Sequence, residues 1–416
     1  MQRLISRSLQ HLVRTGTLDV TFASGQRCTF GDRSEALIHI RFSDRAAEMA
    51  LVLDPAMKLG ELFMDGRLMV EQGTIYDLVA LLKRNGLRRL NAPHVALVAL
   101  WRTLKARISR AVNPAGAKRN VAHHYDLDAG LFELFLDADR QYSCAYFETP
   151  DQSLDEAQLA KKRHVASKLL LQPGLNILDI GSGWGGLALY LAEVSGAKVT
   201  GVTLAEEQIK IARQRASERQ LDHRVDFQLK DYRHLDGRFD RIVSVGMFEH
   251  VGVKNFKTFF TKAASLLERE NGVMLLHSIG RTKPVFFNQP FVEKYIFPGG
   301  YIPALSEVLP AIEQSGLLVK DIEILPLHYA WTLRAWRERF MENRGKAAAL
   351  YDERFCRMWE FYLATSEAAF RHDRLFVFQI QLARHQDAVP YWRRYATQTE
   401  DQLKDVEASA LAARLK

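Results

Sequence analysis

A glycine-rich turn that carries one carboxylate is the strongest chemical signal in this sequence of 416 residues. The stretch LDIGSGWGG at 178–186 follows a short apolar run, and apolar residues at helical spacing come after it. A strand, a glycine turn and a helix in this order leave backbone N–H groups accessible without Cβ atoms in the way, so a nucleotide-bearing ligand can approach closely. The sequence therefore predicts a cofactor cradle around Asp179, Gly181 and Gly183.

Two classes of cofactor fit such a turn. Gly181, Gly183 and Gly186 satisfy the GxGxxG spacing of dinucleotide-binding folds, which is a weak signal by itself. A dinucleotide site also needs a carboxylate about twenty residues later, at the end of the second strand. Thr203 occupies that place, and the carboxylate is instead Asp179, two residues before the first glycine. This arrangement is typical of S-adenosylmethionine-dependent methyltransferases, so we favour S-adenosylmethionine as the cofactor.

The elements around this turn must bring other side chains to it. Strands are expected at 198–202, 225–229, 239–245, 272–277, 318–325 and 375–382. Their alternation with helices predicts a doubly wound α/β sheet, in which ligands bind at the carboxyl ends of the strands. That rim would carry Asp231, Glu249 and His277 together with the glycine turn.

A chain of this length is expected to form two domains. Short apolar stretches separated by turns predict a small α+β domain at residues 1–112. We expect a linker at 113–120, the methyltransferase domain at 121–390 and a charged carboxy-terminal tail at 391–416. The segment 121–147 is rich in aromatic residues, and we expect it to fold over the site as a lid.

Charge and composition limit the partners. The 57 basic and 49 acidic residues give a net charge of +8, which favours anionic partners such as nucleic acid or phospholipid headgroups. No recognised nucleic-acid motif accompanies the charge, so nucleic acid is disfavoured. No uncharged run reaches the roughly 20 residues of a membrane span, so membrane contact would be peripheral. Three distant cysteines and the lack of a secretory signal favour a reducing, cytoplasmic compartment.

The basic residues are concentrated in one segment. Residues 83–119 contain ten Lys or Arg and no Asp or Glu, and 94–112 has the pattern of an amphipathic helix with Trp101 on its apolar side. Two interpretations remain open: an interdomain helix with a solvated basic face, or a surface that binds anionic lipid.

Eight stretches of the sequence resemble one family. They are HHYD at 123–126, YSCAYF at 142–147, LDIGSGWGG at 178–186, GVTLAEEQ at 201–208, MFEHVG at 247–252, HSIG at 277–280, KYIFPGG at 294–300 and HYAWTLRAW at 328–336. Together they are similar to the cyclopropane fatty acid synthases, which include bacterial phospholipid enzymes and mycolic acid cyclopropane synthases. The resemblance implies a class I S-adenosylmethionine methyltransferase fold, which is Rossmann-like, with a smaller amino-terminal α+β domain.

The resemblance also implies which residues bind S-adenosylmethionine. Thr203 and Gln208 would contact it in place of the missing carboxylate, and Asp231 and Tyr232 would lie near the adenine. The other expected contacts are Tyr142, Ser143, Asp179, Gly181, Gly183 and Leu204.

The family further binds a bicarbonate ion at the reaction centre. Its pocket maps onto Cys144, Glu249, His277, Ile279 and Tyr329. The polar members have structural alternatives: a buried small thiol, a salt-bridged loop acid, a strand-end histidine and a packing tyrosine. A nucleophilic role for the cysteine is disfavoured. The two adjacent histidines of HHYD do not have metal-ligand spacing, so no metal is expected.

The expected chemistry follows from the substrate. An alkene is a poor nucleophile, so it must be held in line with the sulfonium methyl group. Attack leaves a carbocation, which requires a dry, aromatic-lined site and a base that removes a proton. We therefore expect methylene transfer to the cis double bond of an unsaturated phospholipid, with bicarbonate as the base and the aromatic residues of 286–301 along the acyl chain.

Other outcomes remain open. An enzyme of the same family could resolve the carbocation differently and give a methyl-branched or methyl-unsaturated chain. A non-catalytic lipid-surface binding protein is the alternative from another class, and a small-molecule methyltransferase is disfavoured by the apolar lid. Family likeness and the basic segment imply a peripheral protein at the inner face of the membrane, and family likeness implies a homodimer.

Overall fold

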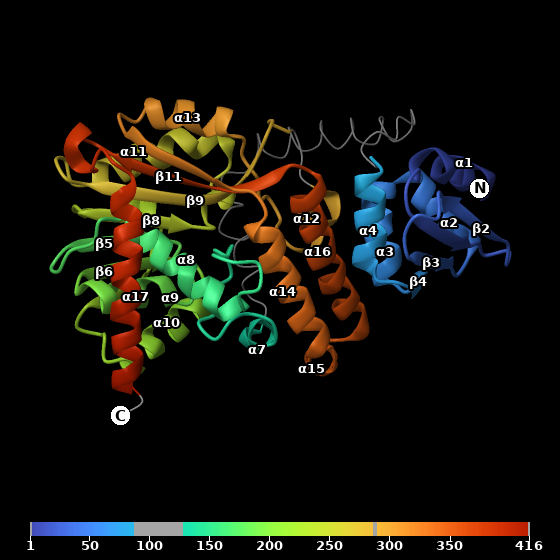
Figure 1. Ribbon diagram of the computed structural model, residues 1–416, viewed down its shortest axis with the longest axis horizontal. Coiled ribbons are helices and arrows are strands. Elements are labelled where there is room, and N and C mark those ends of the chain that lie inside the picture. The colour runs from blue at the N-terminus through green and yellow to red at the C-terminus, as the bar shows by residue number, and fades with distance from the viewer. Residues whose placement is uncertain (1, 87–127, 286–288, 415–416) are drawn as a thin grey trace. The chain divides into compact units, whose positions relative to one another are not determined.

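The computed structural model describes residues 2–86, 128–285 and 289–414, which form two compact units (Figure 1). Of these residues, the first unit contains 2–86, 285, 289–298 and 333–375, and the second contains 128–284, 299–332 and 376–414. The segments 289–298 and 333–375 group with the amino-terminal residues, although both fall inside the domain expected at 121–390.

Several expectations lie outside the described residues. They are the amphipathic helix at 94–112, the linker at 113–120, the HHYD stretch at 123–126 and the domain boundaries at 112 and 121. These assignments stay predictions.

The first unit is built on a four-stranded sheet. Within the described residues its order is β2-β1-β3-β4, from β1 (Thr17–Thr21), β2 (Arg27–Gly31), β3 (Leu37–Phe42) and β4 (Leu68–Gln72). β1 pairs with β2 antiparallel and with β3 parallel, and β3 pairs with β4 antiparallel. The helices around it are α1 (Gln2–Leu12), α2 (Arg45–Leu53), α3 (Pro55–Met64) and α4 (Ile75–Arg84).

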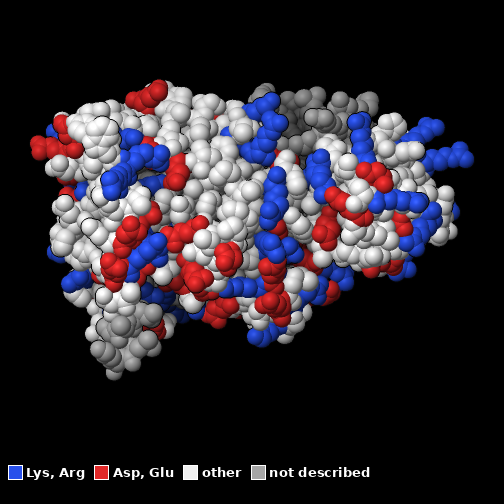
Figure 2. All heavy atoms as spheres, viewed as in Figure 1, with Lys and Arg blue, Asp and Glu red and all other residues white. Residues whose placement is uncertain are grey.

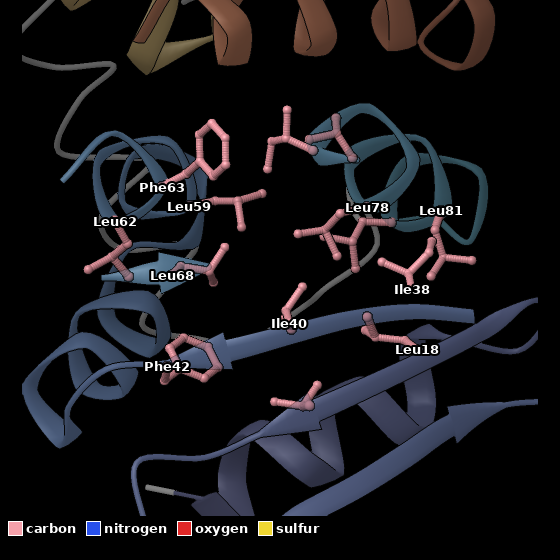
Figure 3. Packing of buried hydrophobic residues seen from close by; sticks show 14 of the residues in the cluster. Leu18, Ile38, Ile40, Phe42, Leu59, Leu62, Phe63, Leu68, Leu78 and Leu81 are labelled. Atoms are coloured by element: carbon pink, nitrogen blue, oxygen red, sulfur yellow. The ribbon is translucent and has the colours of Figure 1, made fainter. Parts of the chain in front are cut away.

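The core of the first unit combines amino-terminal residues with residues from later segments of the chain. Figure 3 shows Leu59 of α3 and Leu78 of α4 directed toward Ile40 of the sheet. The same core contains Phe291 of α12 (Pro290–Tyr295) and Phe361 of α16 (Glu353–His372). Phe291 is fully buried there, so this member of the expected acyl-chain wall is a core residue. The other helices of this part are α14 (His328–Glu342) and α15 (Arg344–Leu350).

The second unit is a sheet of seven strands between layers of helices (Figure 1). Among the described residues the order is β10-β11-β9-β8-β5-β6-β7. The strands are β5 (Asn176–Ile180), β6 (Lys198–Thr203), β7 (Val225–Leu229), β8 (Arg241–Val245), β9 (Val273–Arg281), β10 (Leu318–Leu325) and β11 (Leu375–Ala383). β5 to β9 pair in parallel, and β10 pairs with β11 antiparallel.

The expected doubly wound sheet is therefore confirmed, and the strands at 225–229 and 318–325 have the expected bounds. β5 lies between β6 and β8, so the strand order reverses next to the glycine turn. Ligands of open α/β sheets bind at such a reversal, beyond the carboxyl ends of the strands.

The helices of the second unit include one polar helix that is buried. They are α7 (Ala129–Glu133), α8 (Leu154–Lys168), α9 (Gly186–Ser195), α10 (Glu206–Glu218), α11 (Phe256–Leu266), α13 (Leu305–Glu313) and α17 (Arg394–Arg414). α8 begins with a capping box between Ser153 and Glu156. Most of its residues are buried although many are charged, and α17 packs against it (Figure 1). Much of the expected tail at 391–416 is thus a helix that covers another helix.

The described surface carries charges of both signs. On the face drawn in Figure 2, Lys and Arg side chains are interspersed with Asp and Glu side chains. Ion pairs such as Arg344 with Glu353 and Arg354 with Asp65 account for part of this pattern. None of the helices among the described residues is long and apolar enough to cross a membrane.

Candidate functional site

The glycine turn after β5 has an open space over Gly183. Gly181 and Gly183 have positive φ angles of 88° and 53°, which glycine adopts without strain. A Cβ atom on Gly181 would meet Met247 Cβ at 2.7 Å, whereas one on Gly183 would have no described neighbour within 4 Å. α9 begins at Gly186, so its N-terminal N–H groups lie at the end of the same turn. The turn therefore forms a cradle with room for a ligand at Gly183.

The end of β6 brings Thr203 and Gln208 together. The Thr203 hydroxyl donates to Gln208 Oε1 at 3.2 Å and accepts from the Ala205 N–H at 3.2 Å. Both polar side chains are buried, and Leu204 between them is half-buried. This loop offers a hydroxyl and an amide at the place where a dinucleotide enzyme has its acid.

The neighbouring strand β7 is followed by Asp231 and Tyr232. Asp231 pairs with the Arg233 guanidinium at 2.6 Å. Burial opposes ionisation, but the hydrogen bonds from Arg233 hold the pKa of Asp231 below its ordinary value. The Tyr232 ring packs edge-on against Phe259, with the ring centroids 5.4 Å apart. The end of β7 therefore presents an ionised carboxylate beside an aromatic ring.

Segment 141–145 lies against both the glycine turn and the end of β8. A Cβ atom on Gly246, just after β8, would lie 3.6 Å from Ser143 Cβ. One on Gly186 would clash with the Gln141 side chain. Glycine at these two positions lets the segment come close to the cradle.

Aromatic rings join the described part of the expected lid to the glycine turn. Phe132 of α7 packs against Trp184, with the ring centroids 4.8 Å apart. Tyr142 packs edge-on against the same Phe132 at 5.2 Å. Residues 128–147 therefore contact the cradle, as expected for a lid.

A buried lysine that was not expected from the sequence holds segment 141–145. Lys161 of α8 is fully buried, and its ammonium donates to Gln141 Oε1 at 2.6 Å and to Ser143 Oγ at 2.9 Å. Burial lowers the pKa of Lys161 to about 8, against the attraction of Asp137. In the sequence of a polar helix, a buried lysine cannot be distinguished from an exposed one, so Lys161 was not predicted as a site residue.

Asp179 of the glycine turn is buried near this lysine. Its Oδ2 atom has no hydrogen-bond partner among the described residues. Burial raises the pKa of Asp179 to about 7, although the Lys161 ammonium opposes this shift. A carboxyl group and an ammonium are thus enclosed next to the cradle.

Glu249 and Ile279 meet at the ends of β8 and β9. Glu249 lies in the short helical turn Phe248–His250, and its Oε1 atom accepts the Ile279 N–H at 2.7 Å. Its Oε2 atom is buried and has no partner within the part of the chain that is described. Burial raises the pKa of Glu249, although the Ile279 N–H opposes this. The Glu249 carboxyl group therefore keeps one oxygen available to a ligand.

His277 lies on the same strand, β9, as Ile279. They are two positions apart on β9, with one residue between them, so both side chains lie on one face of the sheet. His277 is 2% exposed, and its Nε2 atom has no hydrogen-bond partner among residues 2–86, 128–285 and 289–414. Three of the five expected pocket residues thus come from two adjacent strand ends.

Cys144 and Tyr329 reach the site from other segments. The Cys144 thiol is fully buried, and burial raises its pKa, so the residue is a poor nucleophile. The neighbouring Ala145 N–H donates to Thr332 Oγ1 of α14 at 3.0 Å. Tyr329 lies one turn earlier in α14 and is half-buried. The first turns of α14 therefore contact segment 141–145 through Thr332, and the place of Tyr329 in the pocket stays a prediction.

Buried polar groups continue behind His277, between α8 and the sheet. His277 Nδ1 is 3.1 Å from Gln379 Nε2 of β11, and Gln379 Oε1 accepts from Lys168 at 2.7 Å. Lys168 also contacts Glu323 of β10, which bonds to His164 at 2.7 Å. Gln379 and Lys168 were not among the expected site residues, because strand and helix periodicity mark them only as polar positions.

The arrangement suits two kinds of ligand. Four buried polar atoms near the strand ends have no partner among the described residues, namely Asp179 Oδ2, Ser182 Oγ, Glu249 Oε2 and His277 Nε2. Such atoms are costly to bury alone, so a polar ligand would stabilise them. The open turn at Gly183 fits a nucleotide-bearing cofactor, and the Glu249–His277 region fits a small polar species.

Family models match two regions of the chain. The model described as mycolic acid cyclopropane synthetase matches residues 113–380, which is more than half of the chain. A second model, described as a domain of unknown function, matches residues 4–91.

Individual proteins also match the chain. The cyclopropane-fatty-acyl-phospholipid synthase of Escherichia coli is 40% identical over 332 residues, which cover 79% of this chain and 83% of that protein. A probable fatty acid methyltransferase of Pseudomonas putida is 44% identical over 267 residues, 62% of this chain and 68% of that protein. The crystal structure of mycolic acid cyclopropane synthase CmaA1 complexed with SAH and CTAB aligns with a TM-score of 0.61 and 35% identity, covering 65% of this chain and 99% of that one.

Proposed function

Because the chain belongs to the mycolic acid cyclopropane synthetase family, whose members include S-adenosylmethionine-dependent methyltransferases, we propose that it cyclopropanates the cis double bond of unsaturated phospholipid acyl chains. In general terms, the chain is an S-adenosylmethionine-dependent methyltransferase of lipid acyl chains. The cyclopropanation proposal rests on two buried atoms beside the cradle, Glu249 Oε2 and His277 Nε2. Neither atom has a hydrogen-bond partner among the described residues.

The cofactor supplies an electrophilic methyl group on a sulfonium centre. The chain would hold this cofactor, with the open turn at Gly183, the Thr203–Gln208 pair and Asp231 around the nucleoside. Ser143, which accepts a hydrogen bond from the Lys161 ammonium, would contact the methionine part. Orientation is the main contribution that such a site makes to attack by an alkene.

The pocket residues would serve the removal of a proton from the transferred methyl group. The alkene carbon would form a bond to the methyl carbon while the methyl–sulfur bond breaks and S-adenosylhomocysteine leaves, and the neighbouring alkene carbon would become cationic. Loss of a proton from the transferred methyl group would then close the ring. A bicarbonate ion between Glu249 and His277 would accept this proton. Tyr329 would donate a hydrogen bond to it, and Cys144 and Ile279 would line its pocket. The burial of Cys144, Glu249 and His277 would help to keep water from trapping the cation.

A second outcome of the same chemistry has its own support. If the cation loses a proton from the acyl chain instead, the product is a methyl-unsaturated chain, and its reduction gives a methyl branch. The Pseudomonas relative is named a probable fatty acid methyltransferase, which makes this product the alternative to test. The intact cradle disfavours a non-catalytic lipid-binding protein.

Labelled cofactor and vesicles of unsaturated phosphatidylglycerol test the proposal. We expect label in the extracted acyl chains and a mass gain of one CH₂ unit in a chain that ozone no longer cleaves. A labelled chain that ozone still cleaves would favour the methyl-unsaturated product, and bound cofactor without label in the lipid would favour a binding protein. The variant Glu249→Gln should lose at least about 100-fold in kcat, whereas Glu270→Gln, at an exposed position, should not.

The membrane partner is also a proposal. The basic segment 83–119 would bind anionic headgroups at the cytoplasmic face of the membrane, and a homodimer would form there. Replacing Arg102, Lys105 and Arg107 with Glu should weaken vesicle pelleting at low salt and leave cofactor affinity unchanged. Unchanged pelleting would assign the segment to the interdomain role.

A further inference from the structure

Three buried side chains form a hydrogen-bonded row that ends at His277. Lys168 Nζ donates to Gln379 Oε1 at 2.7 Å, and Gln379 Nε2 is 3.1 Å from His277 Nδ1. The exposed fractions are 4% for Lys168, 1% for Gln379 and 2% for His277. Water therefore does not compete for these bonds, and each atom must match its protein partner.

The lysine decides which way the glutamine amide points. An ammonium group has only hydrogens to offer, so the Gln379 atom that faces Lys168 must be the carbonyl oxygen. The opposite orientation would put the Gln379 NH₂ group against the ammonium, donor against donor. Lys168 also contacts Glu323, whose pKa is held to about 2 by His164 and Lys168 in spite of burial. That ionised carboxylate favours the charged form of Lys168.

The glutamine then decides which nitrogen of His277 carries hydrogen. With its oxygen facing Lys168, Gln379 presents the NH₂ group to His277 Nδ1. An amide NH₂ group only donates, so Nδ1 must accept with its lone pair. In a neutral imidazole the hydrogen is then on Nε2. Nε2 is the atom that has no partner among the described residues.

The surroundings also keep His277 neutral. Burial lowers the pKa of His277 well below its ordinary value, and Lys161, Lys168, His164 and His328 act in the same direction. A neutral ring has two tautomers, and only one of them satisfies the Gln379 amide.

We propose that Lys168 and Gln379 are positioning residues that hold neutral His277 with its hydrogen on Nε2, so that His277 presents a hydrogen-bond donor, and not a base, to the reacting centre. This inference rests on the proposed function, because it takes the reacting centre to lie at Nε2. A donor there binds an anionic oxygen and leaves the proton-accepting role to the anion. The other tautomer would place a lone pair against that oxygen and repel it.

The tautomer is measured directly by nitrogen NMR of protein labelled with ¹⁵N-histidine. His277→Asn identifies the signals of this ring by their loss. In the wild-type protein we expect the protonated nitrogen to be Nε2. In Gln379→Glu a carboxylate oxygen faces Nδ1 and can only accept, so the hydrogen should move to Nδ1. A wild-type ring protonated at Nδ1 would overturn the proposal.

Kinetics test what the tautomer does. Gln379→Glu and Gln379→Met should lower kcat by about 100-fold and leave KM for S-adenosylmethionine within about twofold. Lys168→Arg keeps a charged donor and should retain most of the activity, whereas Lys168→Met should not. Gln381→Glu is the matched control, because Gln381 is equally buried on the same face of β11 but bonds to Tyr395 Oη and the Lys168 carbonyl. Circular dichroism and S-adenosylhomocysteine binding show whether each variant is folded.

The outcomes separate this inference from the proposed function. A wild-type protein that transfers no methyl group to lipid would refute the proposed function, and the NMR result would still judge the tautomer. If the wild-type protein is active and Gln379→Glu moves the hydrogen without lowering kcat below that of Gln381→Glu, the positioning role is refuted and the proposed function stands.

Discussion

Single buried charges determine what the cradle can bind. Lys161 is the clearest case, because its ammonium contacts two side chains of segment 141–145 and is shielded from solvent. Apolar cores tolerate such a group only when it is hydrogen-bonded. Gln141 and Ser143 supply those hydrogen bonds, and a ligand with a negative group, such as the carboxylate of a methionine moiety, would stabilise the ammonium further.

Replacing Lys161 with Met should weaken S-adenosylhomocysteine binding by about 10- to 100-fold, because hydrogen bonds from a charged donor contribute about 1.5–3 kcal/mol. Isothermal titration calorimetry measures the change. Lys198→Met, at an exposed position on β6, serves as the control. A folded Lys161→Met protein with wild-type affinity would show that the ammonium does not act on the cofactor.

Residue types in motifs were the part of the site that could be predicted. Thr203 and Gln208 were expected to act together, and the structure joins them by a hydrogen bond. Glu249, His277 and Ile279 were expected in one pocket, and they lie on adjacent strand ends. Lys161, Lys168 and Gln379 were missed, because a buried lysine differs from a solvated one only by tertiary contacts that no spacing records.

At the scale of elements, α8 shows why periodicity failed. A helix whose sequence is polar all round is expected in solvent, yet α8 is buried. Its charges are compensated one by one: Arg163 pairs with Glu407, and His164 bonds to Glu323 and Glu400. The Tyr146 ring stacks on His164 with the centroids 4.1 Å apart. Carboxylates from β10 and α17 therefore take the place of the solvent that a polar helix is expected to contact.

The His164 cluster predicts a pH dependence of stability. Burial lowers the pKa of His164, but the hydrogen bonds to Glu323 and Glu400 outweigh it, so the pKa is raised above 6.5. The folded state therefore holds a proton more tightly than the unfolded state does. The stabilisation is complete below pH 6.5 and is lost as the pH rises through the raised pKa.

Melting temperatures of the wild-type protein and His164→Gln across pH 5.5–9 test this. The difference in melting temperature between the two proteins should be largest at the lowest pH of this series and should shrink as the pH rises. His385→Gln, at an exposed histidine, should track the wild-type curve. A gap that is independent of pH would mean that His164 is neutral in the fold.

The packing of α3 predicts opposite effects for two glycines. In an open helix, replacing Gly with Ala stabilises by about 1 kcal/mol. A Cβ atom on Gly60 of α3, however, would lie 2.6 Å from Phe361 Cε1, so Gly60→Ala should destabilise by about 1–3 kcal/mol. Gly345 of α15 has no described neighbour within 4 Å of that position, and Gly345→Ala should be neutral or stabilising. Urea denaturation distinguishes the two, and equal shifts would contradict the observed packing.

At the scale of the whole molecule, sequence order and spatial grouping differ. A doubly wound sheet could be predicted, because each parallel strand is a short apolar run followed by a helix. The grouping of 333–375 with the amino-terminal residues could not, because it depends on which apolar surfaces fit each other. Phe361, Ala364 and Ala368 complete the same core as Leu59 and the strands of the first unit.

A fragment that ends at residue 112 should therefore fail to unfold cooperatively, because its sheet lacks α16 and Phe291. Circular dichroism during urea titration tests this. In the full chain, Phe361→Ala should lower the free energy of unfolding by about 3–5 kcal/mol. A fragment with a sharp transition would show that the residues up to 112 form a core by themselves.

The covering of α8 by α17 has a consequence for the order in which the protein matures. Two of the carboxylates that accompany Arg163 and His164 belong to Glu407 and Glu400, more than 230 residues later in the chain. Until the ribosome has made those residues, Arg163 and His164 of α8 lack these partners, and α8 is not covered by α17. A nascent or truncated chain would then hold the methyl donor poorly, so catalytic competence would arise only after synthesis has passed α17.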